Sequence, residues 1–273
     1  MINIIVSQGR IADRANGMIK GAAMTAKAFA IQYGIKPVYL GTPSPARHDD
    51  WSESLPEAKE TLTLLKSELQ NIIEKGHIPV VLNNTCSASL ATLPVIAEEN
   101  ENVVVLWIDA HGDFNLPQTS TSGYLGGMVL AAASGLWDSG HGAGIKPENI
   151  VLVGARDIDD QEAALIRRSG VRIVSPSEVS EERILKEIGS AKVWVHIDWD
   201  VMEPGYLPAD YTVPGGLVPS QIRSILSAIP RSSYTGLEIA ELNASDDEKV
   251  NEKALSLIIE MTDPFFIKQQ TEY

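Results

Sequence analysis

The sequence is poor in cysteine and in basic residues and has no long apolar run, and each deficit excludes a class of protein. A single cysteine, Cys86, rules out an intramolecular disulfide. No apolar stretch reaches the roughly 18 residues typical of a membrane-spanning helix, and the N-terminus shows no secretory pattern. The net charge of −14 disfavours nucleic acid and anionic membranes, and either favours a cationic ligand or simply serves solubility. We therefore expect a cytoplasmic protein that binds neither.

Short apolar runs rich in valine and isoleucine alternate with longer amphipathic segments. Helices are predicted between the runs, for example over 55–76, where Leu62, Leu65 and Leu69 form one stripe, and over 180–188. This alternation predicts an α/β fold with a mostly parallel sheet covered on both faces. We expect a single domain over 1–273, since 44% hydrophobic content is enough for one large core. The predicted strands are 2–6, 37–40, 78–83, 102–109, 149–154, 171–174, 192–198 and 234–242.

Acidic residues gather where two of the predicted strands end. DAHGDFN follows the fourth strand and brings Asp109, His111 and Asp113 together, and HIDWDVMEP ends the seventh with Asp198 and Asp200. In open parallel sheets the ligand crevice lies outside the carboxyl ends of the strands. The two-residue period of a strand predicts that Asp198 and Asp200 share one face.

Carboxylates that lie this close are costly unless they are protonated or hold a cation. An isolated DxD is more often a solvated turn or a helix cap, but two such clusters at two strand ends favour a dinuclear metal site. Oxygen ligands with an imidazole and no cysteine-rich pattern suit a hard divalent ion such as Mn²⁺.

Three segments resemble the motifs of the ureohydrolase family, which includes arginase and agmatinase. DAHGDFN resembles DAHxDxN, HIDWDVMEP resembles SxDxDxxDP, and GLEIAELN resembles GLDxxExN, in the family order. The resemblance implies a three-layer α/β/α sandwich with an eight-stranded, mostly parallel sheet, and up to two Mn²⁺ ions that activate water for attack on a guanidinium carbon. It also implies that Asp109 and Asp198 bridge both metals, that Asp113 binds the first, and that His111 and Asp200 bind the second.

Cys86 departs from this family at a ligand position. NNTCS follows the third strand, where the family has GGDHS with a histidine that ligates the first metal. Three roles stay open for Cys86: a thiolate ligand, a small neutral residue beside a weakly held metal, or a catalytic nucleophile. A helix start near Ser87, together with a metal, would lower the pKa of the thiol. We favour weak or absent ligation, because soft sulfur is a poor ligand for hard Mn²⁺.

A second departure removes the expected general acid. TSTSGYLGGM (119–128) resembles TTTSGNLHGxP, and Gly126 stands where the family has a histidine that shuttles protons. The loss of a positioned acid costs roughly two to four orders of magnitude in rate. A guanidine that carries an electron-withdrawing hydroxyl is less basic and needs less help. We therefore expect hydrolysis of N-omega-hydroxy-L-arginine to hydroxyurea and L-ornithine, as in a branch of the family that acts in antibiotic biosynthesis.

The resemblance also implies the substrate contacts. Glu241 matches the glutamate that holds the guanidinium, and with Asp113 it is a predicted catalytic residue. Thr212 is expected to reach the same pocket, and His196, where the family has serine, is interpreted as support rather than as a metal ligand. The amino and carboxylate groups of a small cationic amino acid would be recognised by Asn115, Ser120, Ser122, Asp159 and Glu162.

Three alternatives to this reading stay open. They are a true arginase, another guanidino-acid ureohydrolase, and a non-catalytic metal- or guanidine-binding protein. A homo-oligomer is also open, because members of the family assemble in different ways.

Overall fold

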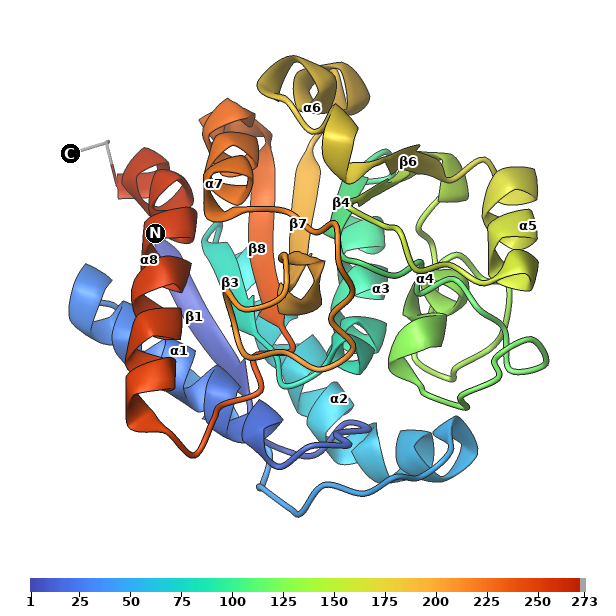
Figure 1. Ribbon diagram of the computed structural model, residues 1–273, viewed down its shortest axis with the longest axis horizontal. Helices are drawn as coiled ribbons and strands as arrows, with labels where there is room; N and C mark the ends of the chain where they lie inside the picture. The colour runs from blue at the N-terminus through green and yellow to red at the C-terminus, as the bar shows by residue number, and fades with distance from the viewer. Residues whose placement is uncertain (271–273) are drawn as a thin grey trace.

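The computed structural model describes residues 1–270 and contains an eight-stranded sheet between two layers of helices (Figure 1). All neighbouring strands are parallel, and their order is β2-β1-β3-β8-β7-β4-β5-β6. Each predicted strand is present within two residues of its expected bounds, so the predicted α/β sandwich is confirmed. The strands are β1 (Ile2–Ser7), β2 (Val38–Leu40), β3 (Ile78–Leu82), β4 (Val104–Ile108), β5 (Ile150–Val153), β6 (Arg172–Val174), β7 (Val193–Asp198) and β8 (Tyr234–Ala240).

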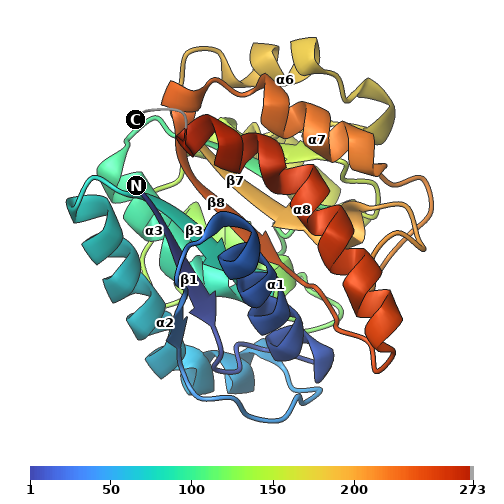
Figure 2. The ribbon, with the colours of Figure 1, turned by 90° about the vertical axis from the view of Figure 1, so that its left-hand side faces the viewer.

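Helices cover both faces of the sheet, and Figure 2 shows α1, α7 and α8 on one side with α2 and α3 on the other. One layer consists of α1 (Gly17–Tyr33), α6 (Glu181–Ile188), α7 (Pro219–Ala228) and α8 (Glu248–Gln270). The other consists of α2 (Trp51–Glu74), α3 (Ser89–Glu99), α4 (Val129–Ala133) and α5 (Asp160–Ser169). Within residues 1–270, no helix combines the length and the apolar character needed to cross a membrane.

Strand β4 is apolar throughout because both of its faces are covered. In β4 every side chain is buried, and alternate residues belong to opposite layers: Leu106 and Ile108 belong to the core on the side of α1, α6, α7 and α8, whereas Val105 and Trp107 belong to the core on the side of α2, α3, α4 and α5.

The neighbouring strands β7 and β8 also bury polar side chains within the strand, at His196 and Glu238. The acidic residues Asp109, Asp198 and Glu241 come at or just after strand ends, at the carboxyl edge of the sheet.

Helix α2 carries the predicted leucine stripe but begins four residues earlier than the pattern indicates, at Trp51 rather than 55. Asp50 causes the earlier start, because its carboxylate accepts a hydrogen bond from the amide of Ser52 and forms a capping box with Glu53. Three short 3-10 turns matter for the site: η1 (Cys86–Ala88), η2 (Gly126–Met128) and η5 (Trp199–Val201).

Shortening the middle of the leucine stripe tests this packing. Leu65 is 0% exposed, so Leu65→Ala should lower the free energy of unfolding by about 2–5 kcal/mol through lost burial and a cavity. The adjacent Leu64 is 38% exposed, and Leu64→Ala should cost about 0.5 kcal/mol or less. Denaturant titration of both variants measures the difference, and equal losses would contradict the assigned inward face of α2.

Candidate metal centre and substrate pocket

A cavity of about 280 Å³ opens at the carboxyl ends of the four central strands. Cys86 follows β3, Asp198 ends β7 and Glu241 follows β8, so the parallel sheet brings Cys86 next to two residues that lie more than 100 positions later in the chain. Asp109 follows β4 and is buried next to the cavity. The predicted residues that line the cavity are Cys86, His111, Asp113, Asn115, Ser120, Ser122, Asp159, Glu162, Asp198, Asp200 and Glu241.

One predicted pocket residue is misplaced. Thr212 lies outside the cavity lining, and its neighbours Asp210 and Tyr211 line the cavity instead. Tyr211 has a left-handed backbone, with φ of 59°. The sequence pattern around position 212 gave no sign of this reversal, and the side chain that reaches the pocket differs by one residue from the one predicted.

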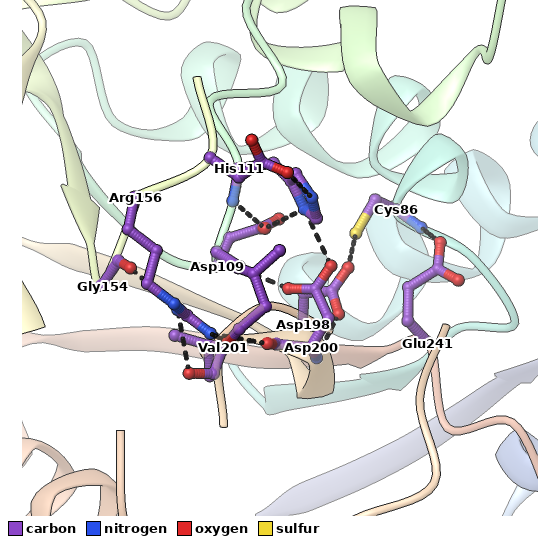
Figure 3. Close-up of polar contacts among 12 residues, drawn as sticks. Cys86, Asp109, His111, Gly154, Arg156, Asp198, Asp200, Val201 and Glu241 are labelled. Atoms are coloured by element: carbon purple, nitrogen blue, oxygen red, sulfur yellow. Dashed lines mark hydrogen bonds and ion pairs between the residues drawn. The ribbon is translucent and has the colours of Figure 1, made fainter. Parts of the chain in front are cut away.

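His111 lies between two buried carboxylates (Figure 3). Its Nδ1 atom is 2.8 Å from Asp200 Oδ2 and 3.3 Å from Asp109 Oδ1. Burial disfavours the charged ring, but the hydrogen bonds to Asp109 and Asp200 prevail and raise the pKa of His111 well above its usual range. Burial likewise opposes ionisation of Asp109, yet His111 lowers the pKa of that carboxyl to about 2. The positively charged ring of His111 therefore lies at a point where the surrounding carboxylates favour a cation.

The pKa values of the other carboxyls of the cluster are raised, that of Asp200 despite its contact with His111. Burial, followed by the charges of neighbouring carboxylates, raises the pKa of Asp113 and of Asp198 well above the ordinary value. Burial and the charge of Asp109 raise the pKa of Asp200 to about 7. A divalent cation would remove this mutual repulsion, so the donor set fits a metal.

The possible ligand atoms lie close enough to share metal ions. Those of Asp109, His111 and Asp200 are within 4.8 Å of one another, and so are those of Cys86, Asp198 and Glu241. A third such group consists of Cys86, Asp109 and His196. The groups differ from the two clusters in the sequence, because Asp200 joins Asp109 and His111, whereas Asp198 joins Cys86 and Glu241. Carboxylate oxygens dominate the first two groups, which is the chemistry that hard divalent ions prefer.

Asp198 and Asp200 lie close together, but not because they share one face of a strand, as the two-residue period predicted. Strand β7 ends at Asp198, and η5 begins with Trp199, so Asp200 lies on a turn and not on the strand. The backbone amide of Asp200 donates to Asp198 Oδ1 at 2.7 Å. The tight turn, rather than strand alternation, therefore brings the two carboxylates into one site.

Cys86 is buried, and its thiol contacts two polar side chains. Its Sγ atom donates to Asp198 Oδ2 at 3.0 Å and lies 3.2 Å from His196 Nε2. His196 Nδ1 is 3.0 Å from Glu238 Oε2, and the ring stacks on Trp107 with the centroids 3.5 Å apart. Burial, and then the charges of nearby carboxylates led by Asp198, raise the pKa of the thiol well above its usual value. The protein's own groups therefore act against the lowering that a helix start and a metal together were expected to produce.

The loop that carries Cys86 is anchored to the segment after β1. Thr85 Oγ1 donates to the carbonyl of Ile11 at 2.6 Å, and Asn84 Nδ2 donates to Asp13 Oδ2 at 2.5 Å. The amide of Ile11 also donates to Asp13 Oδ2 at 2.7 Å. Even with these donors, burial raises the pKa of Asp13 to about 6.

The residues expected to bind the amino-acid part of a substrate lie together at the mouth of the cavity. Asn115 Nδ2 donates to Asp159 Oδ2 at 3.1 Å, and Asp159 also caps α5 by accepting from two backbone amides. Glu162 accepts from the amide of Phe114, and burial raises its pKa to about 7. Ser120 and Ser122 accept hydrogen bonds within their own turn while facing the cavity.

Both predicted catalytic residues have left-handed backbones. The φ angles are 46° at Asp113 and 66° at Glu241, a region that non-glycine residues enter at a cost of order 1–3 kcal/mol. Glu241 Oε1 accepts from the amide of Cys86 and from the Tyr124 hydroxyl, each at 3.0 Å. Hydrogen bonds therefore hold the carboxylate in place at the end of β8.

Sequence reasoning missed several residues of the cavity wall. Arg14 lies in the segment that follows β1, and its position after a strand was the signal that could have identified it as a cavity residue. Tyr124 stands where the family segment has asparagine, and that difference was a visible signal. Asp157 lies in GARDIDDQE (154–162), the stretch that also supplies Asp159 and Glu162, so a signal for it was present. Asp210 lies in a loop for which the sequence offers no such signal.

Comparison with known proteins gives consistent results. The family model described as "Arginase family" matches residues 21–262. The chain is 54% identical over 266 residues, covering 97% of each chain, to an N(omega)-hydroxy-L-arginine amidinohydrolase from Streptomyces lavendulae. It is 32% identical to an arginase from Bacillus caldovelox over 72% of this chain and 71% of that relative. The native structure of the Bacillus caldovelox arginase superimposes with a TM-score of 0.84 at 27% identity, with 97% of each chain covered.

The buried carboxyl beneath the Cys86 loop makes a pH-dependent contribution to stability. Because the pKa of Asp13 is raised to about 6 in the folded chain, the folded state binds the proton more tightly than the unfolded state, and stability falls as pH rises from about 4 to about 6. Asp13→Asn removes this penalty, so its stability relative to wild type should improve by up to about 3 kcal/mol across that range.

Thermal unfolding at pH 4 and pH 7 measures this change. Asp246→Asn, at an exposed aspartate, controls for the substitution itself. A wild-type to Asp13→Asn difference that stays constant with pH would contradict the assignment.

Proposed function

The chain belongs to the arginase family, and from that membership we propose that it hydrolyses the guanidino group of N-omega-hydroxy-L-arginine to hydroxyurea and L-ornithine. The observation that carries the proposal is the 54% identity, over nearly the whole of both chains, to a relative named for that substrate. Gly126 in the cavity wall supports it, because an enzyme without a positioned acid there suits a less basic guanidine.

The acidic cavity suits a cationic amino acid. Glu241 would hold the guanidine group, since a fixed carboxylate offers charge and paired hydrogen bonds to a planar cation. Burial raises the pKa of Glu241 to about 8, so a bound cation favours its ionised form. Asn115, Asp159 and Glu162 would meet the amino and carboxylate groups at the mouth of the cavity, with Ser120 and Ser122.

We further propose that Mn²⁺ is the metal and that Asp109, His111, Asp113, Asp198 and Asp200 hold it. Such an ion supplies a water of lowered pKa as the nucleophile. Asp113 lies in the same cavity and would relay a proton toward the leaving nitrogen. A cytoplasmic location and a role in antibiotic biosynthesis stay predictions.

The contacts of Cys86 favour a second candidate reaction. Cys86 contacts His196, and His196 contacts Glu238, which is the arrangement of a nucleophile, a base and the group that orients the base. Against it, burial and surrounding carboxylates raise the pKa of the thiol, so the nucleophilic thiolate is disfavoured. We therefore place metal-assisted hydrolysis first.

A product assay separates these candidates. The purified chain should release hydroxyurea and ornithine from hydroxyarginine in the presence of Mn²⁺, with arginine turned over at least about 100-fold more slowly for want of a shuttle acid at Gly126. Agmatine, which has no carboxylate, should be a poor substrate. Chelation should abolish turnover. Activity that survives complete chelation would identify Cys86 as the nucleophile, and no turnover of any substrate would support a binding protein.

Metal content tests the role of Cys86. The wild-type protein should keep about one Mn²⁺ per chain after dialysis, because a neutral thiol is a weak ligand. An imidazole at position 86 would collide with His196, whose Nε2 is only 3.2 Å from Sγ. Cys86→His alone should therefore gain little, whereas Cys86→His with His196→Ser should approach two ions per chain.

Mass spectrometry of the native protein counts the ions. Buried Glu238 keeps hydrogen bonds from Asn83, Ser89, Thr92 and Trp194 in the double variant, so folding should survive. Two ions in the wild type, or no gain in the double variant, would overturn the weak-ligand interpretation of Cys86.

A further inference from the structure

Tyr124 occupies the part of the cavity wall next to the residue proposed to hold the guanidine. Its hydroxyl donates to Glu241 Oε1 at 3.0 Å. The Arg14 guanidinium lies 4.8 Å from the centre of the ring, and the ring of Tyr211 is 5.9 Å away. Contacts on the ring and at the hydroxyl therefore fix the position of the phenol in the cavity.

The tyrosine at position 124 and the glycine at position 126 are structurally linked. A Cβ atom built at Gly126 would lie 2.5 Å from Cε1 of Tyr124 and 3.1 Å from Cζ, which is too close for any side chain. The ring of Tyr124 thus fills the space that a side chain at position 126 would need. The chain has exchanged a group at 126 for a phenol that reaches the cavity from 124.

The hydrogen bonds of Glu241 show what this exchange does. Oε1 already accepts two, from the Cys86 amide and from the Tyr124 hydroxyl. A guanidine that binds through this oxygen has to displace the phenol, because an oxygen of a carboxylate accepts about two hydrogen bonds. The displaced hydroxyl then needs a new partner, or it is left unpaired at a cost.

We propose that Tyr124 determines specificity by forming a hydrogen bond with the N-hydroxyl group of the substrate. This inference rests on the proposed function. The phenol can donate and accept, as can an N-hydroxyl group, so hydroxyarginine offers the displaced phenol a partner beside Glu241. Arginine has no oxygen there and leaves the phenol unpaired. Sites built around a substrate hydroxyl reject the analogue that lacks it.

Removing the phenol oxygen tests the proposal. Tyr124→Phe keeps the ring next to Gly126 and deletes only the hydroxyl, so the fold should be retained. The kcat/KM for hydroxyarginine should fall about 10- to 100-fold, whereas the inhibition constant of arginine as a competitive ligand should decrease about 5-fold or more, because no phenol is left unpaired. Tyr39→Phe, at a tyrosine 49% exposed on β2, is the matched control and should leave both values unchanged.

Each outcome decides a point. A fall confined to hydroxyarginine supports the assignment to Tyr124. Equal losses for both ligands, as a structural defect would cause, overturn it, and so does wild-type discrimination in Tyr124→Phe. If the wild-type chain fails to turn over hydroxyarginine at all, the proposed function falls and the inference falls with it, an outcome distinct from the others.

Discussion

Repulsion among buried carboxylates is the constraint on which the carboxyl edge of the sheet depends. Asp109, Asp198 and Asp200 come from two adjacent strand ends and are nearly inaccessible to solvent. The chain offsets part of the cost with backbone donors, because the amides of Ala110, His111 and Asp200 each donate to one of these carboxylates. The repulsion that these hydrogen bonds do not offset would be reduced by a bound cation. The cluster can therefore exist in the folded chain and still favour metal binding.

A second polar layer lies beneath this cluster and gives Cys86 its setting. Glu238 is fully buried on β8, and although burial opposes its ionisation, hydrogen bonds led by that of His196 lower its pKa. The imidazole is thus held by a carboxylate on one side and meets the thiol on the other. Relative to the family motifs, the chain has lost a histidine at position 86 and has one at 196, where the motif has serine. The side chains at these two positions contact each other in the structure.

Backbone strain is concentrated where chemistry is expected. Asp113, Tyr211 and Glu241 have positive φ angles and all line the cavity. Such conformations persist when surrounding contacts hold them, and Glu241 is held from two directions by Cys86 and Tyr124. The buried central strands supply the base from which these strained residues project.

The sequence by itself determined the fold and the members of the acidic cluster. Apolar runs with a strand length predict a covered parallel sheet, and the polar residues after 102–109 and 192–198 had to meet at its carboxyl edge. Only the tertiary structure decided which side chains share space. Strand order decided that His196 contacts Cys86. The local backbone decided that the ring of Tyr124 excludes a side chain at Gly126. A left-handed turn at Tyr211 decided that this residue, and not Thr212, lines the cavity. Contacts of this kind join residues distant in the chain or reverse its direction, and local periodicity contains no information about either.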